Sequence, residues 1–188
     1  INKLIVATNQ NDILHRAISN GGYEVENVFE TLSPSMDIQV ASNFERLLYD
    51  LNEGDDLQTI DAMKNIKEEE KHIINQEKLD KINVDFLSAR ISEEEVLKTI
   101  SKVYEKFKIV LDPHSAIGYG AFDKINLDGN NIVLATAHPC KFPDAIKKAI
   151  NLKEDLPKEL MFVMEEKENY DILDNDVEKI KQHIKERI

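Results

Sequence analysis

The sequence has 188 residues, which is enough for one domain with a sizeable hydrophobic core. Apolar residues make up 41% of it and charged residues 32%, a globular composition that excludes disorder throughout. The net charge of −12 argues against nucleic acid and anionic membranes as partners, because both need clustered Lys and Arg. A small anionic substrate is compatible with this charge, since backbone N–H groups can bind one locally.

The first apolar run, Leu4–Ala7, predicts a short buried strand that ends in polar residues. Apolar residues then recur at helical spacing from Ile13 until Gly21 and Gly22 end the helix. Residues 31–36 indicate a loop around a proline, and the apolar positions within residues 38–51 fit one face of a second helix.

Residues 52–83 are the least globular part of the sequence, because they carry a charged run at Glu68–Lys71 and few large apolar side chains. We expect short surface helices there. Residues 84–89 predict another strand. Ser92 is the expected N-cap of a helix of about four turns, with acidic residues favourably placed in its first turn.

The remaining sequence again alternates strand-like and helix-like segments. Strands are expected at residues 109–111 and 131–135, and helical segments after Asp112 and at residues 142–150, 156–168 and 176–188. This alternation predicts an α/β fold class with a largely parallel sheet. In such sheets ligands bind outside the carboxyl ends of the strands, so the residues that follow each strand are the candidates for a site.

Thr136 follows the expected strand 131–135 and allows two interpretations. Its hydroxyl could hydrogen-bond a ligand at the carboxyl end of the strand, or it could cap the next helix. Asp112 and Ser115 follow strand 109–111, where a carboxylate before a proline suits the start of a helix. A further polar cluster can bind anions or simply form a hydrated loop, and its members are Ser33, Ser35, Asp37, Asn43 and Arg46.

The sequence gives little support for a nucleophilic or metal site. His138 and Cys140 lie two residues apart around a proline, with no third group to orient the imidazole. The five histidines form no pair with metal-ligand spacing. Cys140 is the single cysteine, which excludes an internal disulfide and any multi-cysteine zinc site. We expect no metal.

No apolar run approaches the ~18 residues that span a bilayer, and no signal-peptide pattern is visible. We therefore expect a cytoplasmic protein. Because the sequence opens on Ile1 within an apolar run, we also expect it to be a piece of a longer protein.

Four stretches of the sequence resemble bacterial and fungal threonine synthases, which are pyridoxal-phosphate enzymes of the tryptophan-synthase-like fold type II. They occur in the family's order with compatible spacing and are Leu4–Leu14, Thr31–Leu48, Leu111–Gly118 and Leu134–Pro143. The resemblance implies a three-layer αβα domain, corresponding to the C-terminal part of the large domain of such an enzyme. It is weakest between Leu51 and Val84, so the segment of about residues 52–83 is expected to be variable.

The resemblance implies a lyase that converts O-phospho-L-homoserine and water to L-threonine and phosphate in threonine biosynthesis. It also implies pyridoxal 5'-phosphate as cofactor, with the ring nitrogen met by the hydroxyl of Thr136 and with Asp112 and Ser115 nearby. The family more often has Thr where this sequence has Ser115, and Ala where it has Cys140.

The family's Schiff-base lysine and its Gly-rich phosphate loop precede the residues that match Ile1. No lysine of this sequence matches the catalytic motif, so we expect the isolated chain to be inactive and to bind cofactor weakly or not at all. We expect an apolar edge where the missing N-terminal half would pack, and hence possible self-association.

Two alternatives stay open on the sequence. One is a threonine-synthase-like phospholyase that eliminates phosphate to give a 2-keto acid, because both enzymes share the cofactor apparatus. The other is a stand-alone, non-catalytic interaction domain that uses its acidic surface.

Overall fold

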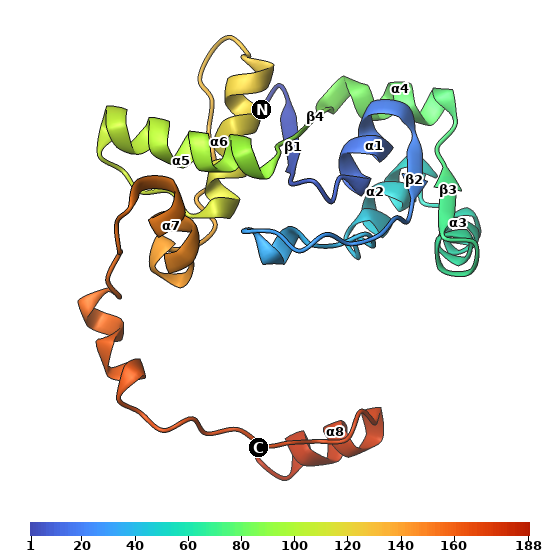
Figure 1. The fold of residues 1–188 in the computed structure, drawn as a ribbon. Coiled ribbons are helices and arrows are strands. Elements are labelled where there is room, and N and C mark those ends of the chain that lie inside the picture. The colour runs from blue at the N-terminus through green and yellow to red at the C-terminus, as the bar shows by residue number, and fades with distance from the viewer. The chain divides into compact units, whose positions relative to one another are not determined.

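The computed structural model describes residues 1–188 and divides into two compact units, Ile1–Glu154 and Asp155–Ile188. Strands and helices alternate along most of the first unit (Figure 1). In chain order, and with η for a 3₁₀ turn, its elements are β1 Leu4–Thr8, α1 Ile13–Asn20, β2 Gly22–Glu24, η1 Pro34–Met36, α2 Phe44–Leu51, α3 Asp56–Glu68, β3 Lys71–Ile73, α4 Gln76–Asp85, β4 Phe86–Arg90, α5 Glu93–Phe107, α6 Pro113–Ile125, η2 Pro139–Lys141 and α7 Pro143–Ile150.

Strands β1 and β4 form a parallel pair in which Leu4 lies opposite Phe86 and Thr8 opposite Arg90. Successive side chains of a strand point to opposite faces. Accordingly Val6 packs against one hydrophobic cluster, whereas Ile5 and Ala7 pack against another. Helix α1 lies on one side of the strands and α6 on the other (Figure 1). Helices therefore cover both faces of a parallel pair, and the predicted α/β class is confirmed.

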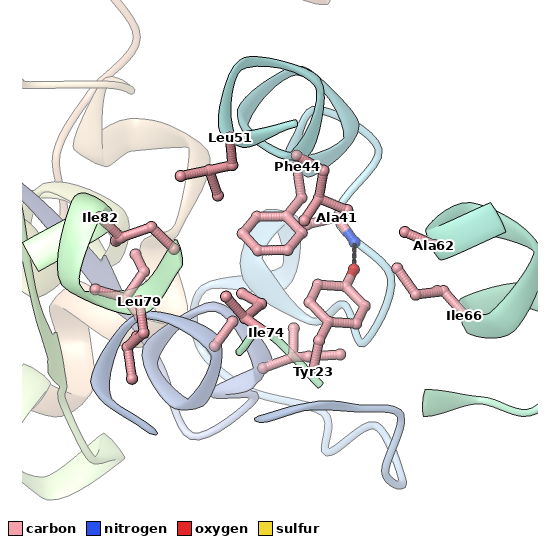
Figure 2. Close-up of a cluster of buried hydrophobic side chains, with 13 residues drawn as sticks. Tyr23, Ala41, Phe44, Leu51, Ala62, Ile66, Ile74, Leu79 and Ile82 are labelled. Atoms are coloured by element: carbon pink, nitrogen blue, oxygen red, sulfur yellow. Dashed lines mark hydrogen bonds between the residues drawn. The ribbon is translucent and has the colours of Figure 1, made fainter. Parts of the chain in front are cut away.

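The first cluster surrounds Tyr23, whose ring stacks on Phe44 with centroids 4.8 Å apart (Figure 2). It also takes up part of the segment expected to carry only surface helices. Ala62 and Ile66 of α3 and Ile82 of α4 are nearly fully buried. The expected helices are present, and each also buries one face, because a few apolar residues spaced three or four apart are enough for this.

A second, antiparallel pair joins β2 to β3, with Tyr23 opposite His72. Gly21 ends α1 with φ +79°, in the left-handed conformation that glycine adopts without strain. Its carbonyl then accepts a hydrogen bond from the amide of Ile74 at 2.9 Å. The sequence predicted the glycine stop but not this short sheet.

The expected strands at 109–111 and 131–135 form no ladder in this structure. Both segments leave apolar side chains exposed, with Ile109 55%, Ile132 90% and Leu134 73% accessible. A strand forms only where another strand supplies hydrogen bonds, and neither segment pairs with a free edge of the two-stranded β1–β4 sheet. The prediction of these two strands was wrong, because an apolar run alone does not provide a pairing partner.

Helix starts agree with the sequence where a capping residue defines them. Ser92 caps α5 and exchanges hydrogen bonds with Glu95, while Asp112 caps α6. Helix α2 begins only at Phe44, rather than near Ile38, because the preceding residues form η1 and turns.

The second unit contains η3, Lys158–Met164, and α8, Val177–Lys185. The helical segment expected at 156–168 is thus a 3₁₀ turn, and the amphipathic segment after Asp176 is a helix as predicted. No helix in the protein combines the length and the apolar character needed to cross a membrane.

Candidate functional site

The N-terminus of α6 forms the first half of the candidate site. Asp112 is 1% exposed and caps the helix. Its carboxylate accepts hydrogen bonds from the His114 amide at 2.9 Å, the His114 Nδ1 at 2.9 Å, the Ser115 amide at 3.4 Å and the Ser115 hydroxyl. Four donors on one carboxylate hold the residues of this turn in a fixed arrangement.

Thr136 is joined to the same turn through its backbone. Its amide donates to Ser115 Oγ at 3.1 Å, while its side chain stays exposed. The three residues singled out in the sequence therefore lie in one hydrogen-bonded chain, Asp112–Ser115–Thr136. The interpretation of Thr136 as a helix cap is wrong, because His138 caps η2 and Phe142 precedes α7.

A buried polar network forms the second half, at the carboxyl end of β1. The amide group of Asn9 is fully buried and donates to Thr31 Oγ1 at 2.9 Å, Ser33 Oγ at 3.0 Å and Asp37 Oδ1 at 2.8 Å. Asn11 also donates to Asp37 Oδ1, at 2.9 Å. The Asp37 carboxylate thus accepts four hydrogen bonds, one from each asparagine and two from the amide and hydroxyl of Thr31.

Sequence reasoning found only part of this network. It singled out Ser33 and Asp37 but described the residues after the first strand only as polar. The signal that could have identified Asn9 is its place directly after a strand of a parallel sheet. Asn43 and Arg46, assigned to the same polar cluster, instead lie exposed at the start of α2.

The two halves meet at Ser35, whose amide donates to His114 Nε2 at 3.4 Å. Beside the Asn9 network, the hydroxyl of Thr8 is buried at the end of β1 without a hydrogen-bond partner in the chain. An unsatisfied buried hydroxyl is costly, which makes it a marker for a bound water or ligand.

The structure shows neither a Cys–His nucleophilic pair nor a metal site. His138 Nδ1 accepts a hydrogen bond from the Cys140 amide at 3.2 Å, so this nitrogen is engaged with backbone rather than with the thiol. No group of three His, Cys, Asp or Glu side chains could hold a metal ion in the protein. A cavity of about 380 Å³ opens elsewhere, beside β4, and His15, Arg90 and Lys124 line part of it.

The cavity beside β4 has a distinct electrostatic character. Burial lowers the pKa of His15, and nearby Arg90 and Lys124 lower it further against the opposing effect of Asp12. Its lining includes none of the residues in the Asp112–Ser115–Thr136 chain. This cavity is therefore separate from the candidate site.

Comparisons with protein families, known sequences and solved structures all find threonine synthases. Residues 115–184 match the family model described as threonine synthase, C-terminal. The chain is 37% identical to a threonine synthase of Pseudomonas aeruginosa over 98% of its length, and 37% identical to that of Saccharomyces cerevisiae over all of it. The structure of a PLP-bound threonine synthase from Brucella melitensis superposes on 99% of the chain with a TM-score of 0.86 and 39% identity.

The chain covers 40%, 42% and 40% of these three proteins, respectively, so it spans about two fifths of the length of the relatives it matches. The family resemblance drawn from four sequence stretches is confirmed, and so is the fold. By sequence and by structure, this chain is similar to threonine synthases over nearly all of its length and matches part of such a protein.

Proposed function

We propose that the protein containing this chain is a threonine synthase, which converts O-phospho-L-homoserine and water to L-threonine and phosphate. The observation that carries the proposal is the similarity to threonine synthases over nearly the whole chain, at 37–39% identity. On this proposal the chain is the C-terminal part of the large domain, with residues of about 52–83 as its variable segment.

The proposal includes pyridoxal 5'-phosphate as cofactor, because one of the similar structures is PLP-bound. The residues present suit a polar ligand. Thr8 offers a buried, unpartnered hydroxyl at the end of β1, and Thr136 is fixed by its backbone while its side chain stays free. We assign Thr136 to the ring nitrogen, with Asp112 and Ser115 behind it.

When bound, the cofactor would supply an electron sink for carbanions formed on the substrate. The role of this chain is then to hold the groups that contact the cofactor and the substrate in a fixed orientation. The Ser115 hydroxyl holds the Thr136 backbone, and the network around Asn9 holds the segment from Thr31 to Asp37 at the end of β1. Fixed groups lose little freedom when a ligand binds, which favours affinity and alignment.

The proposal assigns the lysine that binds the cofactor, and the loop that binds its phosphate, to the part of the protein outside these residues. The chain alone is then inactive and binds cofactor weakly or not at all. Its exposed apolar residues, such as Ile132 and Leu134, favour self-association of the isolated chain. We also propose a cytoplasmic location, in keeping with a single cysteine.

The decisive test is product analysis of the full-length protein with O-phospho-L-homoserine. We expect threonine and phosphate in equal amounts from the full-length protein, and neither from residues 1–188 alone. A 2-keto acid in place of threonine would assign the protein to the threonine-synthase-like phospholyases. No phosphate release from the full-length protein would refute both assignments, and product formation by residues 1–188 would refute the inactivity.

Thr136→Val tests the assignment of the ring nitrogen in the full-length protein, with Thr136→Ser as its matched control. Valine keeps the shape of the side chain but removes the hydroxyl, so cofactor affinity should fall about fivefold to tenfold, the effect of one hydrogen bond. Serine keeps the hydroxyl and should restore most of the affinity. Equal affinities for Thr136→Val and the wild type, measured by cofactor titration of the apoprotein, would contradict the assignment.

A further inference from the structure

His114 lies between the two halves of the candidate site and contacts both. Its Nδ1 is 2.9 Å from Asp112 Oδ1, and its Nε2 accepts a hydrogen bond from the Ser35 amide at 3.4 Å. The side chain is 6% exposed, and the ring packs against Phe142 with centroids 4.8 Å apart. Two hydrogen bonds and a tilted aromatic contact therefore hold the imidazole in place.

These contacts specify one form of the ring. An ionised Asp112 only accepts hydrogen bonds, so Nδ1 must carry a proton. The Ser35 amide only donates, so Nε2 must carry a lone pair. Both conditions hold only in the neutral Nδ1–H tautomer. A ring fixed in this way acts as a spacer of defined length between the α6 turn and η1.

Asp112 has no hydrogen-bonding capacity left for a ligand in this arrangement, and the single donor of Ser115 is already used. Asp112 is 1% exposed and already accepts four hydrogen bonds from its own turn, and Ser115 is 2% exposed. The Ser115 hydroxyl donates to Asp112 and accepts from the Thr136 amide. Both residues therefore reach a ligand only through their neighbours.

We propose that His114 is a positioning residue that couples the Thr31–Asp37 segment to Thr136 through Asp112 and Ser115. The inference rests on the proposed function and refines it, because Asp112 and Ser115 then hold Thr136 in place rather than contact the cofactor themselves. Its Nε2 fixes η1 through Ser35, and Asp112 transmits that position to Ser115 and on to the Thr136 backbone.

Three substitutions of His114 in the full-length protein separate its two hydrogen bonds. His114→Phe keeps the ring and its packing on Phe142 but loses both bonds. His114→Asn retains a donor near Nδ1 and loses the acceptor, whereas His114→Gln retains an acceptor near Nε2. His15→Phe is the matched control, because it removes a comparable imidazole bond, 2.8 Å from His15 Nδ1 to Ser88 Oγ, in the same unit.

The measurements are amide hydrogen exchange of the peptides that contain Ser35 and Thr136, cofactor titration of each apoprotein, and the ¹⁵N shifts of the His114 ring. We expect the Nδ1–H tautomer in the wild type. His114→Phe and His114→Asn should exchange faster at both peptides and bind cofactor about fivefold more weakly, the equivalent of one hydrogen bond. His114→Gln should recover the Ser35 protection and most of the affinity. His15→Phe should lower the melting temperature and leave exchange at both peptides and cofactor affinity unchanged.

Three results would overturn the coupling: an Nε2–H tautomer, wild-type exchange at both peptides in His114→Phe, or equal loss of affinity in the Gln and Phe variants. The last result would show that the bond from Nδ1 to Asp112, which both variants lose, carries the effect without the Ser35 bond. If the wild-type protein binds no cofactor, the proposed function fails separately, while the tautomer and the exchange data still test the coupling.

Discussion

At the scale of single residues, Tyr23 shows how a polar group is accommodated in the core. The residue is 1% exposed, and its hydroxyl accepts a hydrogen bond from the Ala41 amide at 2.8 Å (Figure 2). Burial raises the pKa of Tyr23, so the hydroxyl stays protonated in the folded protein at neutral pH. One bond thus ties the segment before α2 to β2 inside an otherwise apolar cluster.

Tyr23→Phe should lower the free energy of unfolding by about 1–3 kcal/mol, because it leaves the Ala41 N–H buried without an acceptor. Stacking on Phe44 is retained, so the loss reports the hydrogen bond alone. Tyr49→Phe, at a side chain that is 45% exposed, is the control and should be neutral. Urea denaturation of both variants measures the difference, and equal midpoints would contradict the prediction.

The position of Gly21 cannot accept a side chain without cost. A Cβ atom there would lie 2.6 Å from the Ile74 carbonyl oxygen, and its φ of +79° strains any other residue. Gly21→Ala should therefore cost about 2–4 kcal/mol, whereas Gly129→Ala, with a similar positive φ and open space around it, should cost about 1 kcal/mol. Thermal unfolding of the pair separates the steric contribution from the backbone strain.

The sequence predicted local structure at the candidate site. The start of α6 at Asp112 follows from an aspartate–proline pair, whereas the cofactor role of Asp112 and Ser115 came from the family resemblance and stays a prediction. Asn9 could not be found in this way, because its role depends on contacts with Ser33 and Asp37, more than 20 positions along the chain. The same holds for the contact between Ser35 and His114.

At the scale of elements, the start of α5 is fixed by a reciprocal cap between Ser92 and Glu95. The Ser92 hydroxyl accepts from the Glu95 amide at 3.3 Å, and the Glu95 carboxylate accepts from the Ser92 amide at 2.8 Å. Lys124 donates to the other oxygen of Glu95 at 2.8 Å. The hydrogen bond from Lys124, followed by that from the Ser92 amide, lowers the pKa of Glu95.

Glu95→Gln should remove the charge and keep the reciprocal cap, since glutamine also serves at this position. Because the folded state holds the carboxylate ionised, its contribution is present above the unfolded pKa of 4.5 and is lost as the pH falls through the lower folded value. The variant should be less stable at pH 7, by about 0.5 kcal/mol or less for such an exposed pair. The difference should shrink as the pH falls below 4.5.

Denaturation of both proteins at pH 7 and pH 3 measures this effect. Glu94→Gln lies on the same turn and takes no part in the cap, so it controls for the loss of a charge. A difference between Glu95→Gln and wild type that is as large at pH 3 as at pH 7 would contradict the assignment to the ionised carboxylate.

Elements with local signals were predicted well, and elements that need distant partners were not. Helix α5 and the start of α6 follow from capping residues and apolar spacing. Strand β4 was expected within two residues of its observed position, Phe86–Arg90. Residues 109–111 and 131–135 carry the same apolar pattern, yet a ladder depends on a neighbour that no local pattern reveals.

At the scale of the whole molecule, the chain carries apolar surface that its own residues do not cover. Ile109, Ile132 and Leu134 are exposed on extended segments, although Val133 approaches α6 closely at Gly118. A Cβ atom on Gly118 would lie 3.2 Å from the Val133 side chain. The chain spans about two fifths of the length of its relatives, and on the proposed function we expect residues outside it to cover this surface.

Amide exchange of residues 132–134 should therefore be slow in the full-length protein and fast in residues 1–188 alone. Backbone N–H groups gain protection when a neighbouring strand accepts their hydrogen bonds. Residues 5–7 of β1 are the internal control, because their pairing with β4 lies within this chain and should protect them in both proteins. Fast exchange of residues 132–134 in the full-length protein would contradict the prediction.

The pairing of β1 with β4 also has a consequence for how the protein is made. Leu4 and its partner Phe86 are separated by roughly 80 residues, which a ribosome adds in about 4–16 s at typical rates of synthesis. Throughout that interval β1 cannot pair with β4, while the helices between the two strands are already emerging. The carboxyl end of β1, where Thr8 and Asn9 lie, thus gains its pairing with β4 only after residue 90 has been translated. Any pause in translation before that point prolongs the time during which the β4-facing edge of β1 lacks its partner.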